Sequence, residues 1–149
     1  QLLNKTNQMN LSTRRLNERE FNKWAQEDKN NLWTIRAADK FGDYGIVGIF
    51  SISIKDNVAT LVDFILSCRV VGRYIEETMI EFLKEFCYEN NVNKIKGKYK
   101  KTEKNSLCYY FFNKLKLIDS NQHSFEFSSN QKKSNLLNIK VKKPTMEKK

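Results

Sequence analysis

The chain has 149 residues, 40% of them hydrophobic and 18 of them aromatic (10 Phe, 6 Tyr and 2 Trp), so we expect one folded domain rather than a disordered chain. No apolar stretch approaches the roughly 20 residues of a membrane-spanning helix, and no signal-peptide pattern is present, so a cytoplasmic protein without a membrane partner is expected. The net charge of +10 is weak evidence for a nucleic-acid partner, because seven lysines and one glutamate in residues 131–149 contribute +6 of it.

The first predicted elements are a short strand and a helix. NLSTRRL (10–16) has the alternation of a strand. In NEREFNKWAQED (17–28), Asn17 and Glu20 have the spacing of a capping box. A helix is therefore predicted to begin just after Asn17.

Three strands are predicted next. LWTIRAAD (32–39) and IVGIFSISI (46–54) are rich in β-branched and aromatic residues. KFGDYG (40–45) between them predicts a tight hairpin, because glycine readily takes the positive φ of such turns. VATLVDFILSC (58–68) is almost continuously apolar, which indicates a strand buried on both faces.

The second half of the chain begins with a long helix. From Gly72 to about Asn90, apolar residues recur at helical spacing and form one stripe. NKIKGKYK (93–100) is predicted as a strand, KNSLCYYFFNKL (104–115) as an aromatic-rich helix, and LKLIDSN with HSFEFSS (115–129) as a closing hairpin. The order β-α-β-β-β-α-β-α-β-β predicts a mixed α/β domain.

Cysteine spacing argues against a metal site or a disulfide framework. Cys68, Cys87 and Cys108 are about twenty residues apart, with no CxxC motif and one histidine in the chain. Cys87 and Cys108 fall on helix stripes and are expected in the core. Cys68 remains as a candidate nucleophile.

Four segments carry a resemblance to a known family. They are KTNQMNLSTRR (5–15), DKFGDYGIVGI (39–49), LSCRVVGRYIE (66–76) and YKKTEKN (99–105). In order and spacing they are similar to the C-terminal domain of FkbH-like proteins, and the resemblance covers roughly residues 1–118. It implies a GNAT-like acyltransferase fold, an α/β architecture with a mixed, mostly antiparallel sheet flanked by helices.

The same resemblance implies a division of the chain and an activity. Residues 1–130 would be the GNAT-like domain and residues 131–149 a basic polar tail. In the family a HAD-type phosphatase domain precedes this one, and its DxDxT signature is absent here, so the chain is expected to be the C-terminal part of a longer protein.

The implied reaction loads a glyceryl or related acyl unit onto the phosphopantetheine thiol of an acyl carrier protein, for polyketide or polysaccharide biosynthesis. The implied cofactor is CoA or phosphopantetheine. Two alternatives stay open: a CoA-dependent GNAT acetyltransferase and a non-catalytic carrier-docking module. An RNA-binding domain is favoured only by the total charge.

One loop resembles the GNAT pyrophosphate loop, whose usual form is Q/R-x-x-G-x-G/A. It consists of Arg69, Val70, Val71, Gly72, Arg73 and Tyr74. Gly72 would let the backbone approach a phosphate at the start of the following helix, and the two arginines would add positive charge. Tyr74 departs from the pattern, because a small residue is usual there. A glycine that merely turns the chain is the alternative.

Cys68 is predicted at the C-terminal end of the apolar strand, where open α/β sheets tend to bind ligands. Arg69 and the nearby helix N-terminus could favour its thiolate. We therefore expect Cys68 to accept the acyl unit covalently before a carrier thiol takes it. The alternative is an inert cysteine packed within the strand.

Further candidate residues come from the resemblance. Asn105 is similar to the asparagine that opens the GNAT helix along the pantetheine arm, although an N-cap role is equally open. Phe112 replaces the tyrosine that often serves as general acid.

Three more features sit at the edges of the expected site. Asp43 is either a turn residue or a catalytic group facing the acyl pocket. Residues 13–15 are expected near the substrate edge or simply exposed, and His123 is expected at the surface.

Overall fold

The order of elements predicted from the sequence is confirmed. The computed structural model describes residues 8–115, 118–119, 123–130 and 139–143. Its elements are β1 (Met9–Asn10), α2 (Glu18–Ala25), β2 (Asn30–Asp39), β3 (Gly42–Lys55), β4 (Val58–Leu66), α3 (Ile75–Glu89), β5 (Lys94–Lys98), α4 (Ser106–Lys114), β6 (Ile118–Asp119) and β7 (Ser124–Ser128).

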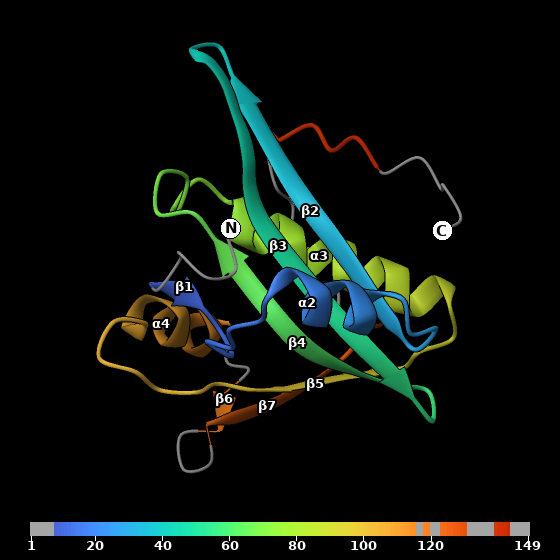
Figure 1. The fold of residues 1–149 in the computed structure, drawn as a ribbon. Coiled ribbons are helices and arrows are strands. Elements are labelled where there is room, and N and C mark those ends of the chain that lie inside the picture. The colour runs from blue at the N-terminus through green and yellow to red at the C-terminus, as the bar shows by residue number, and fades with distance from the viewer. Residues whose placement is uncertain (1–7, 116–117, 120–122, 131–138, 144–149) are drawn as a thin grey trace.

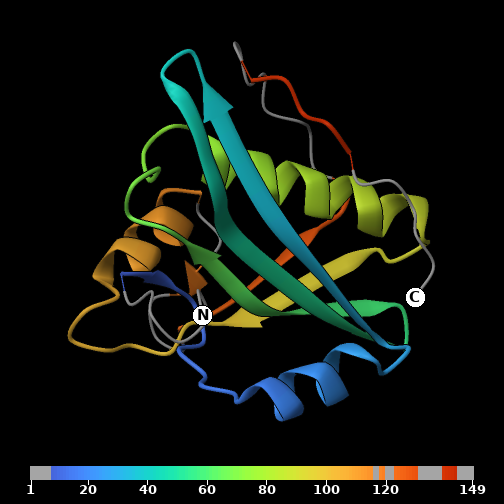
Figure 2. The same ribbon diagram turned by 45° about the horizontal axis from the view of Figure 1, so that its top comes forward.

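The described strands form one mostly antiparallel sheet. Along the sheet the order is β2-β3-β4-β5-β7-β6, and β1 also pairs with β4. The β4–β5 pair is parallel, because α3 connects these two strands as a crossover. Helices α2 and α3 lie on opposite faces of the sheet (Figures 1 and 2).

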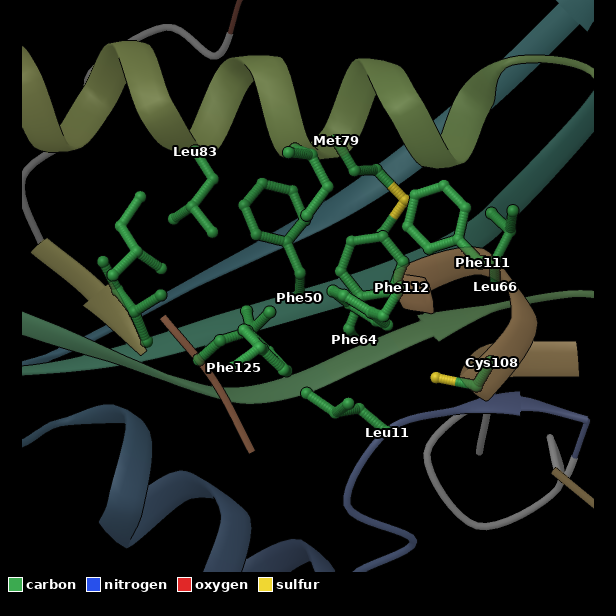
Figure 3. Close-up of a cluster of buried hydrophobic side chains, with 14 of the residues drawn as sticks. Leu11, Phe50, Phe64, Leu66, Met79, Leu83, Cys108, Phe111, Phe112 and Phe125 are labelled. Atoms are coloured by element: carbon green, nitrogen blue, oxygen red, sulfur yellow. The ribbon is translucent and has the colours of Figure 1, made fainter. Parts of the chain in front are cut away.

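Aromatic side chains fill the space between the sheet and α3 (Figure 3). Trp33 of β2 stacks on Phe50 of β3 with ring centroids 4.9 Å apart. Phe64 of β4 stacks on Phe111 of α4, with centroids 5.7 Å apart. The stripe predicted for α3 faces this core, with Met79, Leu83 and Cys87 buried. The apolar periodicity therefore decides which face of α3 packs on the sheet.

Local predictions also hold at α2 and at the hairpin. The capping box is present: Glu20 N donates to Asn17 Oδ1 at 2.8 Å, and Asn17 N donates to Glu20 Oε2 at 2.9 Å. The β2–β3 hairpin turns between Asp39 and Gly42, so its loop is shorter than the predicted segment 40–45.

Two strand predictions need correction. The segment 10–16 is not a strand beyond Asn10, because Thr13 has a positive φ of 53° and the chain turns away from the sheet. The strand predicted over 58–68 ends at Leu66, and Cys68 lies in the turn that follows. Several side chains in the first half of β4 are half-buried, so full burial holds only toward its C-terminal end.

The described segment 139–143 contacts α3 through an ion pair. Lys143 Nζ lies 2.9 Å from Glu85 Oε1 of α3. In the described ranges, no helix is long and apolar enough to cross a membrane. The same ranges hold no cluster of three His, Cys, Asp or Glu side chains suited to a metal ion.

Candidate functional site

The N-terminal segment lies between β4 and the chain that follows β5. Strands β4 and β5 pair only from Val58 and Lys94 to Leu61 and Gly97. Beyond that point, β1 pairs with the end of β4. The N–H of Leu11 donates to the Phe64 carbonyl, and the N–H of Lys100 donates to the Leu11 carbonyl, both at 3.1 Å. Residues 9–11 thus fill this space, which we call the β4–β5 gap.

Cys68 is exposed at the end of β4. The turn around it is anchored by buried neighbours: Ser67 N donates to the Val47 carbonyl at 2.7 Å, and Val70 N donates to the Ser67 carbonyl at 3.1 Å. Arg69 Nε donates to Ser67 Oγ at 3.1 Å. The alternative of a cysteine packed within a strand is therefore wrong, and the thiol is open to a reagent or substrate.

The Gly72 loop, residues 69–74, has the backbone that a glycine allows. Gly72 has a φ of +83°, which glycine adopts without the penalty that a Cβ would bring. Tyr74 also has a positive φ, 64°, and the residue is 59% exposed. Glycine would adopt this φ without strain. Tyr74 therefore departs from the Q/R-x-x-G-x-G/A pattern both in its bulk and in its strained backbone.

A carboxylate lies at the centre of this loop. Gly72 N donates to Glu76 Oε1 at 2.6 Å, and Glu76 is only 4% exposed. Burial raises the pKa of Glu76, the N–H of Gly72 and that of Glu76 itself oppose this rise, and nearby Glu77 adds to it. Glu76 Oε2 has no hydrogen-bond partner within the described part of the chain. Sequence reasoning missed this contact, although two consecutive glutamates in the first turn of α3 were a signal.

Arg73 is turned toward the β2–β3 hairpin. Its Nη1 donates to Asp39 Oδ2 at 3.0 Å and to Tyr44 Oη at 3.1 Å. Tyr44 Oη in turn donates to Asp39 Oδ2 at 2.9 Å. The pKa of Asp39 is lowered mainly by the hydrogen bond from the Phe41 N–H, and further by Tyr44 and Arg73. The hairpin therefore holds one of the two arginines that the sequence offered to a phosphate.

Asp43 has the contacts of a turn residue. Its Oδ1 accepts from Gly45 N at 2.7 Å, and its Oδ2 accepts from Arg36 Nη2 at 3.2 Å. These two donors lower the pKa of Asp43, and its side chain is exposed. The contacts support the turn interpretation, and a catalytic role stays a prediction.

Asn105 is buried and ties a loop to the N-terminal segment. Its Nδ2 donates to the carbonyls of Asn10 and Lys100, at 3.1 and 2.7 Å. Its Oδ1 accepts from Tyr99 Oη and Thr102 N, both at 2.8 Å. Asn105 lies at the N-cap position of α4, but its side chain makes no capping hydrogen bond. Its contacts support a structural role, and a role along a cofactor arm stays a prediction.

A buried ion pair near the site was not foreseen. Asp63 of β4 is fully buried and accepts from Arg14 Nε at 2.8 Å. Arg14 also lies over the Trp24 ring, 4.4 Å from its centroid. Arg14 is thus a packing residue of the N-terminal segment rather than a free group at a substrate edge. The signal was a lone aspartate within an apolar strand, because a buried charge needs a partner.

His123, expected at the surface, is only partly exposed. It is half-buried, with its ring centroid 5.8 Å from that of Tyr99 and 6.1 Å from that of Tyr109. Cys87 and Cys108 are buried as predicted, and burial raises the pKa of each thiol to about 12.

Comparison with known proteins shows the fold. No family model matches the sequence, and no curated protein matches it. A GNAT-family acetyltransferase from Staphylococcus aureus is similar in structure, at a TM-score of 0.57 and 13% identity over 74% of this chain and 75% of that one. The ribosomal-protein-S18-alanine N-acetyltransferase of Escherichia coli also has a TM-score of 0.57, at 8% identity over 85% of each chain.

A third structure was determined with a ligand. The Paia N-acetyltransferase of Thermoplasma acidophilum, in complex with coenzyme A, has a TM-score of 0.50 and 15% identity over 66% of this chain and 61% of that one. At these identities the likeness establishes a GNAT acetyltransferase fold, which is the fold predicted from the sequence.

Proposed function

We propose that this domain is an acyltransferase in which Cys68 receives an acyl unit from a thioester and passes it to the phosphopantetheine thiol of an acyl carrier protein. The observation that carries the proposal is the exposed Cys68 at the end of β4. The GNAT fold supports acyl transfer in general. The glyceryl unit, the carrier protein and a preceding HAD-type domain are proposed from the sequence resemblance, and a cytoplasmic location is proposed from the sequence pattern alone.

The proposed reaction is two thioester exchanges. In the first, the Cys68 thiol loses its proton to water and the thiolate attacks the thioester carbonyl. The bond from this carbon to the donor sulfur breaks, and the donor leaves as a thiolate that takes up a proton from water. In the second, the carrier thiol attacks the acyl-Cys68 carbonyl and the Cys68 thiol is restored. Each step exchanges one C–S bond for another, so no oxidant or reductant is required.

Residues around Cys68 suit this chemistry. Ser67 and Val70 are buried and fix the turn on which the thiol is presented, and a fixed nucleophile lowers the entropic cost of attack. Arg69 is exposed beside it and carries a positive charge that attracts anionic donors and an acidic carrier surface.

The residues present do not fit coenzyme A in the arrangement that the structure shows. The N–H of Gly72 is already donated to Glu76, and Arg73 is held by Asp39 and Tyr44. Residues 9–11 fill the β4–β5 gap. The donor is therefore proposed as a thioester that approaches Cys68 from the exposed side.

Intact-mass spectrometry tests the proposal. The wild-type domain and a Cys68→Ser variant, compared for folding by circular dichroism, are incubated with glyceryl and acetyl thioesters, with and without a phosphopantetheinylated carrier protein. A mass adduct that forms on the wild type, is absent from the variant and moves to the carrier supports the proposal. Equal acylation of the carrier by both proteins would replace it with direct transfer. If neither the domain nor the carrier is acylated in any reaction, the proposal is replaced by a non-catalytic carrier-docking module.

A further inference from the structure

We propose that Glu76 determines which donors this site accepts: its carboxylate occupies the Gly72 loop and excludes the diphosphate of free coenzyme A. The inference rests on the proposed acyl transfer and names the donor class for it. The excluded class is nucleotide diphosphate donors, and the accepted class is thioesters that reach Cys68 without placing a diphosphate in the loop.

The first argument is the hydrogen bond at the centre of the loop. A backbone N–H at the start of a helix is a typical anion-binding group, and the N–H of Gly72 precedes α3 in this way. It already donates to Glu76 Oε1 at 2.6 Å, and a bond to a charged acceptor is among the stronger hydrogen bonds. Glu76 thus stands in for the bound anion, supplied by the protein itself.

The second argument is charge. Glu76 and Glu77 lie together in the first turn of α3, so an incoming diphosphate meets two carboxylates there. Arg73 of the loop donates to Asp39 and Tyr44 instead. The charge of Lys114 in α4 slightly lowers the pKa of Glu76. The helix dipole favours one negative charge at this end, and Glu76 already provides it.

The third argument comes from a different part of the fold. An extended ligand running from the Gly72 loop along β4 would need the space of the β4–β5 gap. Leu11 already occupies it, bonded to Phe64 on one side and to Lys100 on the other. Met9 and Leu11 are buried at 1% and 0% exposure, so the segment is part of the core. Cys68, in contrast, is exposed, and a thioester carried on another protein can reach it without entering the gap.

The experiment measures binding and needs no turnover. Inorganic pyrophosphate and coenzyme A are titrated into the full chain, as the wild type and as Glu76→Ala, Glu76→Gln and Glu77→Ala, with the Gly72 amide followed by NMR. The Glu77→Ala variant is the matched control, because it removes a neighbouring carboxylate that does not bond to Gly72. Circular dichroism compares the folding of all four proteins.

We expect the Gly72 amide of the wild type to be unaffected by either probe. That of Glu77→Ala should shift little, because this change weakens the repulsion but leaves the Gly72 N–H bonded to Glu76. In Glu76→Ala, pyrophosphate should shift this amide and bind about tenfold more tightly or better, since the freed N–H forms one charge-assisted bond. Glu76→Gln removes the charge but keeps an acceptor, so a smaller gain in pyrophosphate affinity is expected. This variant also allows the test to be made if Glu76→Ala does not fold.

Two results would overturn the inference: a wild type that binds coenzyme A at Gly72 as tightly as Glu76→Ala, or folded Glu76 variants that gain no binding. Because no acylation is measured, the outcome is separable from that of the Cys68 experiment. A domain that never acylates Cys68 would contradict the proposed function and leave the loop result unchanged.

Discussion

Removing Arg14 should destabilise the domain strongly, because it leaves the fully buried carboxylate of Asp63 without its cation. Asp63 Oδ1 accepts from Arg14 Nε at 2.8 Å, and Oδ2 accepts from Ser51 Oγ at 2.6 Å. Ser12 Oγ is a weaker donor at 3.3 Å. In Arg14→Ala the two hydroxyl groups would remain as the side-chain donors to a buried charge.

The magnitude follows from the burial of each partner. Breaking a buried pair by removing one partner costs about 3–5 kcal/mol. The Arg14 side chain is 21% exposed, so water screens the pair in part and the low end of that range applies. The contact between Arg14 and Trp24 adds roughly 0.5–1 kcal/mol. We therefore expect Arg14→Ala to lose roughly 3–4 kcal/mol of unfolding free energy, of a total of about 5–15 kcal/mol.

Urea unfolding followed by circular dichroism measures this loss. Arg15→Ala is the control, since Arg15 is the exposed neighbour of the same type, and it should lose less than about 1 kcal/mol, the usual limit for an exposed charged contact. Adding Asp63→Asn to Arg14→Ala should recover part of the loss, because the uncompensated charge is removed. Equal stability of Arg14→Ala and Arg15→Ala would refute the view that Asp63 depends on Arg14.

Three further predictions concern other contacts. A thiol reagent should label only Cys68 in the folded protein and all three cysteines in denaturant, since the other two are buried; rapid labelling of a second thiol in the native state would contradict this. Gly97→Ala should cost about 1–3 kcal/mol in urea unfolding, because its Cβ would lie 2.3 Å from Phe125 Cζ; an unchanged midpoint would show that the ring moves freely. Burial raises the pKa of Glu76 in the folded state above its ordinary 4.5. At any pH between the unfolded-state pKa and this raised pKa, the folded state binds more protons than the unfolded state. The folded state therefore loses stability as pH rises through that window. Glu76→Gln should lack this loss, and stability curves that run parallel from about pH 4 to about pH 8 would disprove the assignment.

Patterns between neighbouring residues were enough to predict much of the fold. Asn17 and Glu20 are three positions apart, and their reciprocal bonds form whenever the helix begins there. The stripe on α3 and the hairpin turn before Gly42 likewise depend on spacing within one element. The glycine of the 69–74 loop was identified for the same reason, since its positive φ is a property of one residue.

The candidate site depended on contacts between distant residues. The sequence predicted a strand over 10–16, but Asn10 bonds to Asn105 and Arg14 bonds to Asp63, and these partners lie far along the chain. No local periodicity encodes such pairs, because a polar residue has many possible partners along the chain until the sheet is assembled.

The sequence by itself therefore determined the order of elements, the face of α3 that is buried and the position of Cys68 beside a glycine loop. Only the tertiary structure decided that Cys68 is exposed, that residues 9–11 fill the β4–β5 gap, and that Glu76 occupies the N–H of Gly72. The physical reason is that hydrogen-bond donors and acceptors must be paired once they are buried. Which groups are buried together is settled by packing and not by spacing along the chain.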